Sequence, residues 1–176
     1  MDPRDVSNFF ALALLLGVVV VGVAAARPST RAELSRRAPL VVAVTAVGAT
    51  AGSLYFSEVA GYIPCTYCWY QRIAMYPIAL IVPIAMLKRD RSILRSSLAL
   101  GAVGLAIAIY HIQLQLFPDQ ASNSCAITSP CTAKWVEAFG FITIPQMAGI
   151  GFAIIVAVSI IGLRMPLTNA STATTR

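Results

Sequence analysis

Four cysteines are the residues of this chain best suited to redox chemistry, and they form two close pairs. Cys65 and Cys68 make a C-x-x-C motif just ahead of an apolar stretch, while Cys125 and Cys131 are separated by five residues in a later loop. Such pairs act as redox dithiols, as inert structural disulfides or as zinc ligands. Spacing alone leaves all three chemistries open.

The position of the C-x-x-C motif favours reactive thiols. A helix N-terminus carries positive partial charge and free N–H groups, which stabilise a thiolate. Cys68 is closest to the first turn of the helix expected to follow, so we expect it to be favoured as the thiolate. Cys65 stands three residues further out and is more open to attack by another thiol.

The composition places these cysteines in a membrane protein. Hydrophobic residues make up 58% of the 176 residues and charged residues only 11%, against about 25% charged in a typical soluble domain. Too little polar side chain is present to cover a water-facing surface. The net charge of +6 does not indicate a nucleic-acid partner, because the basic residues stand in short clusters beside apolar runs.

Five apolar stretches are long enough to cross a bilayer, which takes about 20 residues of helix. Only helices or closed barrels satisfy the backbone in lipid, and continuous apolar runs without alternation exclude a barrel. The sequence therefore predicts an all-α integral membrane protein, a four-helix bundle with an additional N-terminal transmembrane helix. The five predicted spans cover residues 9–26, 39–59, 69–87, 97–117 and 141–163.

These spans divide the chain into three parts. Residues 1–38 hold the N-terminal helix and a basic loop, and residues 39–163 hold the four-helix domain. Residues 164–176 are rich in Ser, Thr and Ala, which predicts a disordered cytoplasmic tail.

The loop charges predict the orientation. Ten basic residues lie on one side of the predicted membrane and two on the other, with Arg72 inside a helix as the thirteenth. The positive-inside rule then puts the N-terminus outside and the C-terminus in the cytoplasm of a bacterial inner membrane. All four cysteines fall in outward loops, where the compartment is oxidising. The ten cytoplasmic residues are Arg27, Arg31, Arg36, Arg37, Lys88, Arg89, Arg91, Arg95, Arg164 and Arg176, and the two outer ones are Arg4 and Lys134.

The first span has an alternative interpretation as a cleaved signal peptide, because residues 24–26 are all alanine, as at a signal-peptidase site. Two features argue for retention. The apolar stretch of about 18 residues is longer than a usual signal core. Cleavage would also leave the loop with four arginines outside, unless the remaining helices inverted.

Three polar residues near the cysteine side of the predicted helices are candidate quinone-binding residues: Gln71, Arg72 and His111. Arg72 lies four residues after Cys68, on the same helix face and about 6 Å deeper. A charge inside a span costs about 2.5–3.5 kcal/mol at mid-depth and less near its end, so a partner such as a quinone carbonyl is expected. The alternatives are an arginine that reaches outward to the headgroups and a histidine that is simply an interfacial polar residue.

Taken together, the motifs resemble the disulfide bond formation protein B (DsbB) family, and look closest to its short Gram-positive branch, often called BdbC. The resemblance covers residues 40–163 and rests on IPCTYCWYQRI at 63–73, MYP at 75–77, SLYFSE at 53–58 and FGFITIP at 139–145.

The resemblance implies a membrane enzyme that reoxidises a secreted thioredoxin-fold dithiol oxidase of DsbA type and passes two electrons to a membrane quinone, ubiquinone or menaquinone. Cys65 and Cys68 then look like the quinone-coupled pair, with Arg72 beside the quinone. Cys125 and Cys131 look like the pair that exchanges with the partner. His111 loosely matches a family histidine near the quinone.

Two departures from the family pattern stand out. An extra helix precedes the usual four, and the loop pair is separated by five residues where the well-known Gram-negative form has a much longer segment.

Other classes of function stay open from the sequence. The vitamin K epoxide reductase family has a similar bundle and works as a disulfide reductase, but its C-x-x-C follows the loop pair, whereas here it precedes it. A non-enzymatic scaffold with two structural disulfides is a second alternative. A zinc site of four thiolates is disfavoured because exposed thiolates pair in an oxidising compartment, so no metal is expected.

Overall fold

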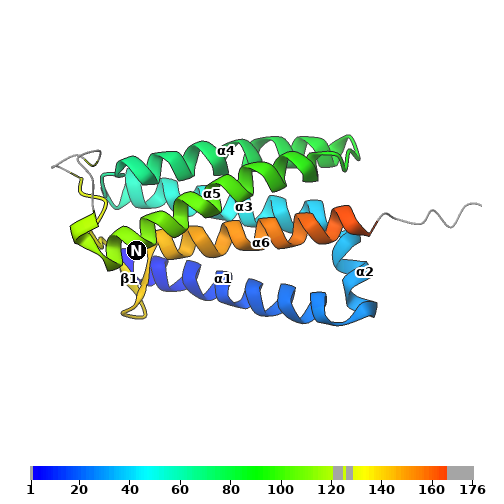
Figure 1. Cartoon of the computed structure of the whole chain (residues 1–176), viewed down its shortest axis with the longest axis horizontal. Helices are drawn as coiled ribbons and strands as arrows, with labels where there is room; N and C mark the ends of the chain where they lie inside the picture. Colours follow the sequence, from blue (N-terminus) through cyan, green and yellow to red (C-terminus); the bar gives the residue numbers. More distant parts are fainter. Residues whose placement is uncertain (1, 121–124, 126–128, 166–176) are drawn as a thin grey trace, which may run out of the picture.

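The computed structural model describes residues 2–120, 125 and 129–165, and within them the chain is almost entirely helical. Five long helices are joined by short connections, a short helix and a two-stranded hairpin (Figure 1). The elements are α1 Pro3–Ala26, α2 Pro28–Arg36, α3 Ala38–Leu54, the π-helical turn η1 Tyr55–Val59, α4 Thr66–Leu87, α5 Ile93–Leu116, the 3₁₀ turn η2 Pro118–Gln120, β1 Glu137–Ala138, β2 Ile142–Thr143 and α6 Ile144–Arg164.

The predicted all-α membrane architecture with five spans is confirmed. Each of α1, α3 with η1, α4, α5 and α6 is long and apolar enough to cross a bilayer. The third of these spans begins at Thr66, three residues before the predicted start, which makes Cys65 the N-cap residue of α4. The C-x-x-C motif therefore straddles a helix start.

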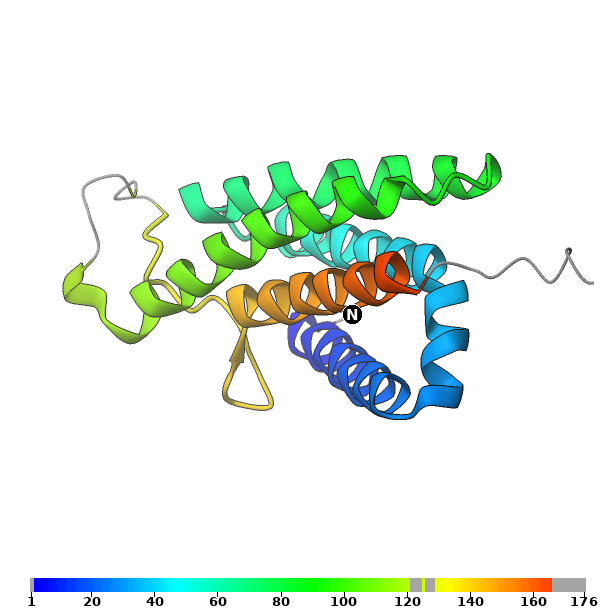
Figure 2. The same cartoon turned by 45° about the vertical axis from the view of Figure 1, so that its right-hand side comes forward.

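Helices α3 to α6 form the bundle, with α5 packed along α6 and α3 along α4. Helices α5 and α6 approach closely because a glycine on one faces a large side chain on the other. A Cβ built on Gly104 would lie 2.2 Å from the ring of Phe152, a side chain that is fully buried. Helix α1 lies at the edge of the bundle beside α6, with α4 at the opposite edge (Figure 2).

The cysteines and the basic loops lie at opposite ends of the bundle. The start of α4, the end of α5 and the start of α6 meet at the end that carries the hairpin (Figure 1). Helix α2 and the α4–α5 connection lie at the other end, where Arg91 donates hydrogen bonds to the carbonyls of Ser35 and Gly162.

Two local features differ from the expectation. The basic segment predicted as a loop contains α2, which has Pro28 at its first turn and a Glu33–Arg37 ion pair along its surface. Residues 141–143, predicted as the start of the last helix, belong to the hairpin instead, since Phe139 and Gly140 adopt positive φ and turn the chain. Residues 166–176 of the predicted tail lie outside the described residues.

Candidate redox site

The N-terminus of α4 holds the first cysteine pair as a dithiol. Cys65 has extended backbone angles and caps the helix, and its sulfur accepts a hydrogen bond from the backbone N–H of Cys68 at 3.5 Å. The two sulfurs are 3.3 Å apart, within hydrogen-bond distance. Cys65 is buried and Cys68 is half-buried.

The expectation that Cys68 is the favoured thiolate is wrong in this geometry. The helix N–H that stabilises negative charge points at the sulfur of Cys65, because Cys68 already lies inside the first turn. Hydrogen bonding to the Cys68 thiol, helped by the neighbouring His111 ring, lowers the pKa of the Cys65 thiol far below its ordinary value. The negative charge of the dithiol therefore belongs on Cys65.

The second pair, Cys125–Cys131, is a disulfide that lies in the same cluster as the first pair. Cys131 is buried and packs in one cluster with Cys65 and Leu114, whereas Cys125 is half-buried. His111 lies between the two pairs, since its Nε2 is 3.5 Å from the sulfur of Cys65 and 3.0 Å from the backbone oxygen of Cys131. The fold thus brings all four predicted cysteines to one place.

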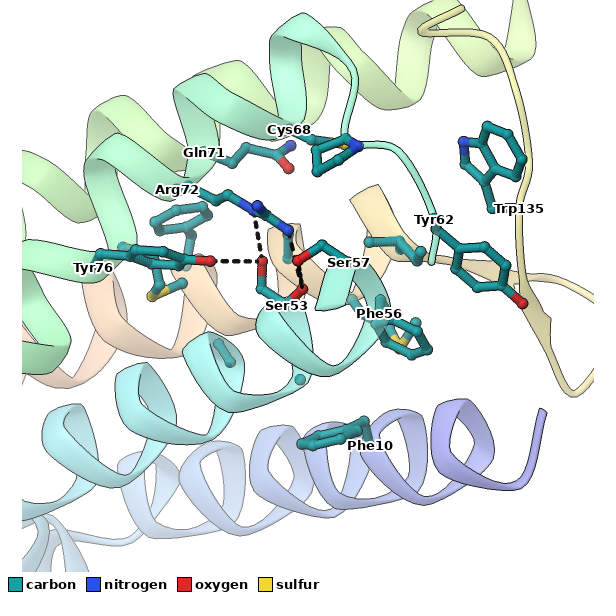
Figure 3. A pocket seen from close by; sticks show the side chains of 18 of the residues that line it. Phe10, Ser53, Phe56, Ser57, Tyr62, Cys68, Gln71, Arg72, Tyr76 and Trp135 are labelled. Atoms are coloured by element: carbon teal, nitrogen blue, oxygen red, sulfur yellow. Dashed lines mark hydrogen bonds between the residues drawn. The ribbon is translucent and has the colours of Figure 1, made fainter. Parts of the chain in front are cut away.

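A cavity opens on the other side of Cys68, between α1, α3 with η1, α4 and α6 (Figure 3). The cavity is open on one side, and the room that it leaves for small molecules is about 110 Å³. Its wall is mostly aromatic or aliphatic. The polar side chains in it include Ser53, Ser57, Gln71, Arg72 and Tyr76.

Arg72 is fixed at this cavity by hydrogen bonds and by two aromatic rings. Its Nε donates to the hydroxyl of Ser53 at 2.9 Å and its Nη2 donates to the carbonyl of the same residue at 3.0 Å. The guanidinium carbon lies 5.0 Å from the centre of the Trp69 ring and 6.0 Å from that of Tyr76. Among the described residues no carboxylate pairs with it. The cation therefore keeps donors for another oxygen.

Gln71 supplies a second donor to the same cavity. Its side chain is buried, and within the described part of the chain its Nε2 has no hydrogen-bond partner. A buried amide without a partner costs roughly 1–3 kcal/mol, so a ligand with a carbonyl oxygen would relieve that cost. Together with Arg72, this amide gives the cavity a donor set suited to carbonyl oxygens.

His111 does not line this cavity. It lines a small cavity on the opposite side of the cysteines, together with Cys65, Gln115 and Thr143. The structure thus brings Gln71 and Arg72, but not His111, to the proposed quinone site. Sequence reasoning did not select Ser53, although it lies in the SLYFSE run that carried part of the family resemblance.

The reduced cysteines and His111 also have the chemistry of metal ligands. Their two sulfurs and one ring nitrogen lie within 4.8 Å of one another, and zinc accepts such ligands with a water in the fourth position. The Nε2 atom is already used at the carbonyl of Cys131, however, so a metal would have to displace that contact. We therefore assign these groups to thiol chemistry.

Five apolar spans with a disulfide and a dithiol stacked at one end define a multi-pass membrane protein of thiol–disulfide chemistry. Comparison with known proteins agrees. The model of the family described as disulfide bond formation protein DsbB matches residues 35–170. The chain belongs to this family, which confirms the resemblance and supports an oxidoreductase role in disulfide-bond formation.

Several curated relatives are similar over most of their length. A probable disulfide formation protein of Oceanobacillus iheyensis is 42% identical over 128 residues, which is 71% of this chain and 88% of the relative. A probable disulfide formation protein C of Halalkalibacterium halodurans is 44% identical over 69% of this chain and 89% of its own. Disulfide bond formation protein C of Bacillus subtilis is 42% identical over 64% and 83%. No solved structure matches the chain.

Proposed function

We propose that the protein is a membrane thiol oxidase that reoxidises a secreted thioredoxin-fold dithiol oxidase and passes two electrons to a membrane quinone. The observation that carries the proposal is the order of the groups. Cys131 packs against Cys65, Cys65 lies beside Cys68, and Cys68 opens onto the cavity that holds Arg72 and Gln71. The sulfurs therefore form a series that leads from the loop to the cavity.

The first step is exchange between the partner and the loop disulfide. A thiolate of the reduced partner attacks the sulfur of Cys125, which is the less buried of the pair, and Cys131 leaves. The second thiol of the partner then displaces Cys125. The partner gains a disulfide, and the loop pair gains two electrons and two protons.

The second step moves these electrons inward. Cys131 attacks Cys65 in the oxidised C-x-x-C pair, Cys68 leaves as thiolate, and Cys125 then closes the loop disulfide again. The ring of His111 lies beside this exchange, since its Nε2 is within reach of the sulfur of Cys65 and of the backbone oxygen of Cys131. The result is the arrangement in the structure, with the loop pair oxidised and Cys65 and Cys68 reduced.

The third step returns Cys65 and Cys68 to a disulfide. A bound quinone would be the oxidant for this step, taking up the two electrons and two protons of the dithiol to become a quinol. Arg72 and Gln71 would hold its carbonyl oxygens and stabilise the negative charge that develops on them.

The basic residues indicate how the protein is oriented in the membrane. Nine described basic residues, from Arg27 to Arg164, lie in the helix ends and connections away from the cysteines (Figure 1), so the positive-inside rule would place the cysteines on the outer face of the membrane. The partner would then meet Cys125 in the compartment where disulfides persist.

A trapping experiment tests the proposal. In a Cys131→Ser variant, the attack on Cys125 cannot be resolved, so a mixed disulfide with a purified thioredoxin-fold dithiol oxidase should accumulate. Cys68→Ser should abolish quinone reduction while the loop pair still exchanges. Failure to trap any partner through Cys125, with a loop disulfide that resists mild reductant, would instead indicate a structural bridge.

The direction of flow separates an oxidase from a reductase of vitamin K epoxide reductase type. On addition of ubiquinone or menaquinone, the thiols of the reduced partner should disappear in the wild-type protein. Thiols that appear on an oxidised partner when quinol is added, without the forward reaction, would overturn the proposed direction.

A further inference from the structure

Helix α1 stands outside the residues that the family model matches, yet it forms part of the cavity. The match begins at residue 35, whereas Phe10 and Leu14 of α1 line the cavity together with residues of α3, α4 and α6. Part of the wall of the proposed quinone site is therefore an addition to the family bundle.

The first half of α1 is seated firmly against the bundle. Ala11 is fully buried in a cluster that contains Phe56 and Met147, and the ring of Phe10 packs next to it. A Cβ built on Gly52 of α3 would lie 3.3 Å from that ring, so the glycine lets Phe10 approach. The side-chain oxygen of Asn8 accepts a hydrogen bond from the N–H of Phe139, which ties α1 to the hairpin turn.

The opposite face of α1 is exposed, as a helix facing lipid should be. Phe9, the direct neighbour of Phe10, is 67% exposed and does not line the cavity, although the two rings touch edge to face with centres 5.8 Å apart. Leu16 and Val20 are also exposed on α1. The helix therefore separates the cavity from the surrounding lipid with one layer of side chains.

The chemistry of the cavity differs between its two ends. Donors gather beside Cys68, where Arg72 and Gln71 would meet the carbonyl oxygens of a quinone. Phe10 approaches from α1, on the side away from Arg72 (Figure 3), and with Leu14 it offers only apolar surface. An apolar substituent on the quinone ring would be held at that end.

We propose that α1 is a selectivity element of the quinone site, in which Phe10 and Leu14 bind the first prenyl unit of the quinone tail. This inference rests on the proposed function, because it concerns the same quinone. The polar end fixes the ring, and α1 then favours prenylated quinones over quinones without a tail.

Quinone binding to the purified, full-length protein in detergent tests the inference without relying on turnover. Trp135 lines the cavity and Trp69 flanks Arg72, so quinone quenching of tryptophan fluorescence reports binding. The probes are ubiquinone with two prenyl units and the same ring without a tail. The variants are Phe10→Ala and its matched control Phe9→Ala, the same change at the next residue on the exposed face.

Phe10→Ala should weaken binding of the prenylated quinone about tenfold, the scale of losing one large apolar contact. It should change binding of the tailless quinone less than about twofold. Phe9→Ala should change the binding of either quinone less than about twofold. Equal behaviour of the two variants would overturn the inference, and so would an equal loss of both quinones in Phe10→Ala. Absence of binding to the wild-type protein would instead reject the quinone site itself.

A crosslinking measurement keeps the inference testable if Phe10→Ala does not fold. A quinone that carries a diazirine in its first prenyl unit should label the wild-type peptide that contains Phe10 and Leu14. Labelling confined to α4 and α6 would overturn the inference.

Discussion

The contact between Ser53 and Arg72 gives a sharp test of how the cavity is organised. Ser53→Ala removes the hydroxyl that accepts from Nε of Arg72 at 2.9 Å and that lies 3.2 Å from the hydroxyl of Tyr76. The backbone carbonyl of Ser53 remains, and it still accepts from Nη2 at 3.0 Å. The variant therefore loosens the guanidinium without removing its charge.

The expected loss follows from the one bond removed. A hydrogen bond to a charged group contributes about 1.5–3 kcal/mol, and the bond that remains on Nη2 keeps the loss at the low end, about 1.5 kcal/mol. Since about 1.4 kcal/mol corresponds to a factor of ten, the specificity constant for the quinone should fall about tenfold. Exchange between the partner and Cys125 should be unchanged, because Ser53 does not touch the loop pair.

Ser57→Ala is the matched control. It is the same substitution one turn further along the same span. The hydroxyl of Ser57 lies within hydrogen-bond distance of the carbonyls of Ser53 and Leu54 and of the Glu58 carboxylate, whereas the side-chain hydroxyl that accepts from Arg72 is that of Ser53. Steady-state quinone reduction with a fixed concentration of reduced partner measures both variants, and Ser57→Ala should stay within about twofold of wild type. A Ser53→Ala protein with unchanged kinetics, or an equal loss in both variants, would refute the role given to this contact.

Two further predictions concern the dithiol and the packing. Because the pKa of Cys65 is lowered, its thiolate persists below neutral pH, so its alkylation, mapped by mass spectrometry with the loop disulfide intact, should hardly slow from pH 8 to pH 6. Alkylation of an ordinary thiol would slow about 100-fold over this range. In His111→Ala, the alkylation of Cys65 should become more dependent on pH. If the alkylation rate of Cys65 hardly changes with pH in both the wild-type protein and His111→Ala, His111 is excluded as a cause of the lowered pKa. Gly104→Ala should destabilise the bundle by about 1–3 kcal/mol in thermal unfolding, because its Cβ meets the buried ring of Phe152. Gly48→Ala is the control, since no described atom lies within 4 Å of a Cβ built there. Equal melting temperatures of the two variants would contradict the predicted destabilisation by Gly104→Ala.

The spans could be predicted from the sequence because the lipid leaves so few options. A continuous apolar run that crosses a bilayer has to be helical, so five such runs predict five helices. The ends of the helices are set by local bonds instead. The start of α4 at Thr66 depends on the cap that Cys65 provides, and the hairpin before α6 depends on the positive φ angles at Phe139 and Gly140. Hydropathy contains no signal for either.

The candidate site was predictable in its sulfurs but not in its surroundings. Motif spacing brought out both cysteine pairs and Arg72, since these residues are unusual for their positions. It could not show that Ser53 holds Arg72, because a serine in an apolar helix is common and the contact joins two helices. The contribution of Phe10 was hidden for the same reason, since a phenylalanine in a membrane span is expected whether it faces lipid or a cavity. The choice of Cys68 as thiolate failed because it depended on a helix start placed three residues too late.

The two cavities give a reason for having two cysteine pairs. Cys65 lines only the small cavity on the side of His111 and the loop, whereas Cys68 lines both this cavity and the large one. Cys131 and Cys65 are almost completely buried. In the proposed relay, electrons from the partner would reach a molecule held beside Arg72 through Cys65 and then Cys68. A direct reaction of partner thiols with the quinone would bypass disulfide exchange and could leave the partner modified instead of oxidised. Under the proposed function, Cys68 would link the two cavities, and the start of α4 lies where both of them meet.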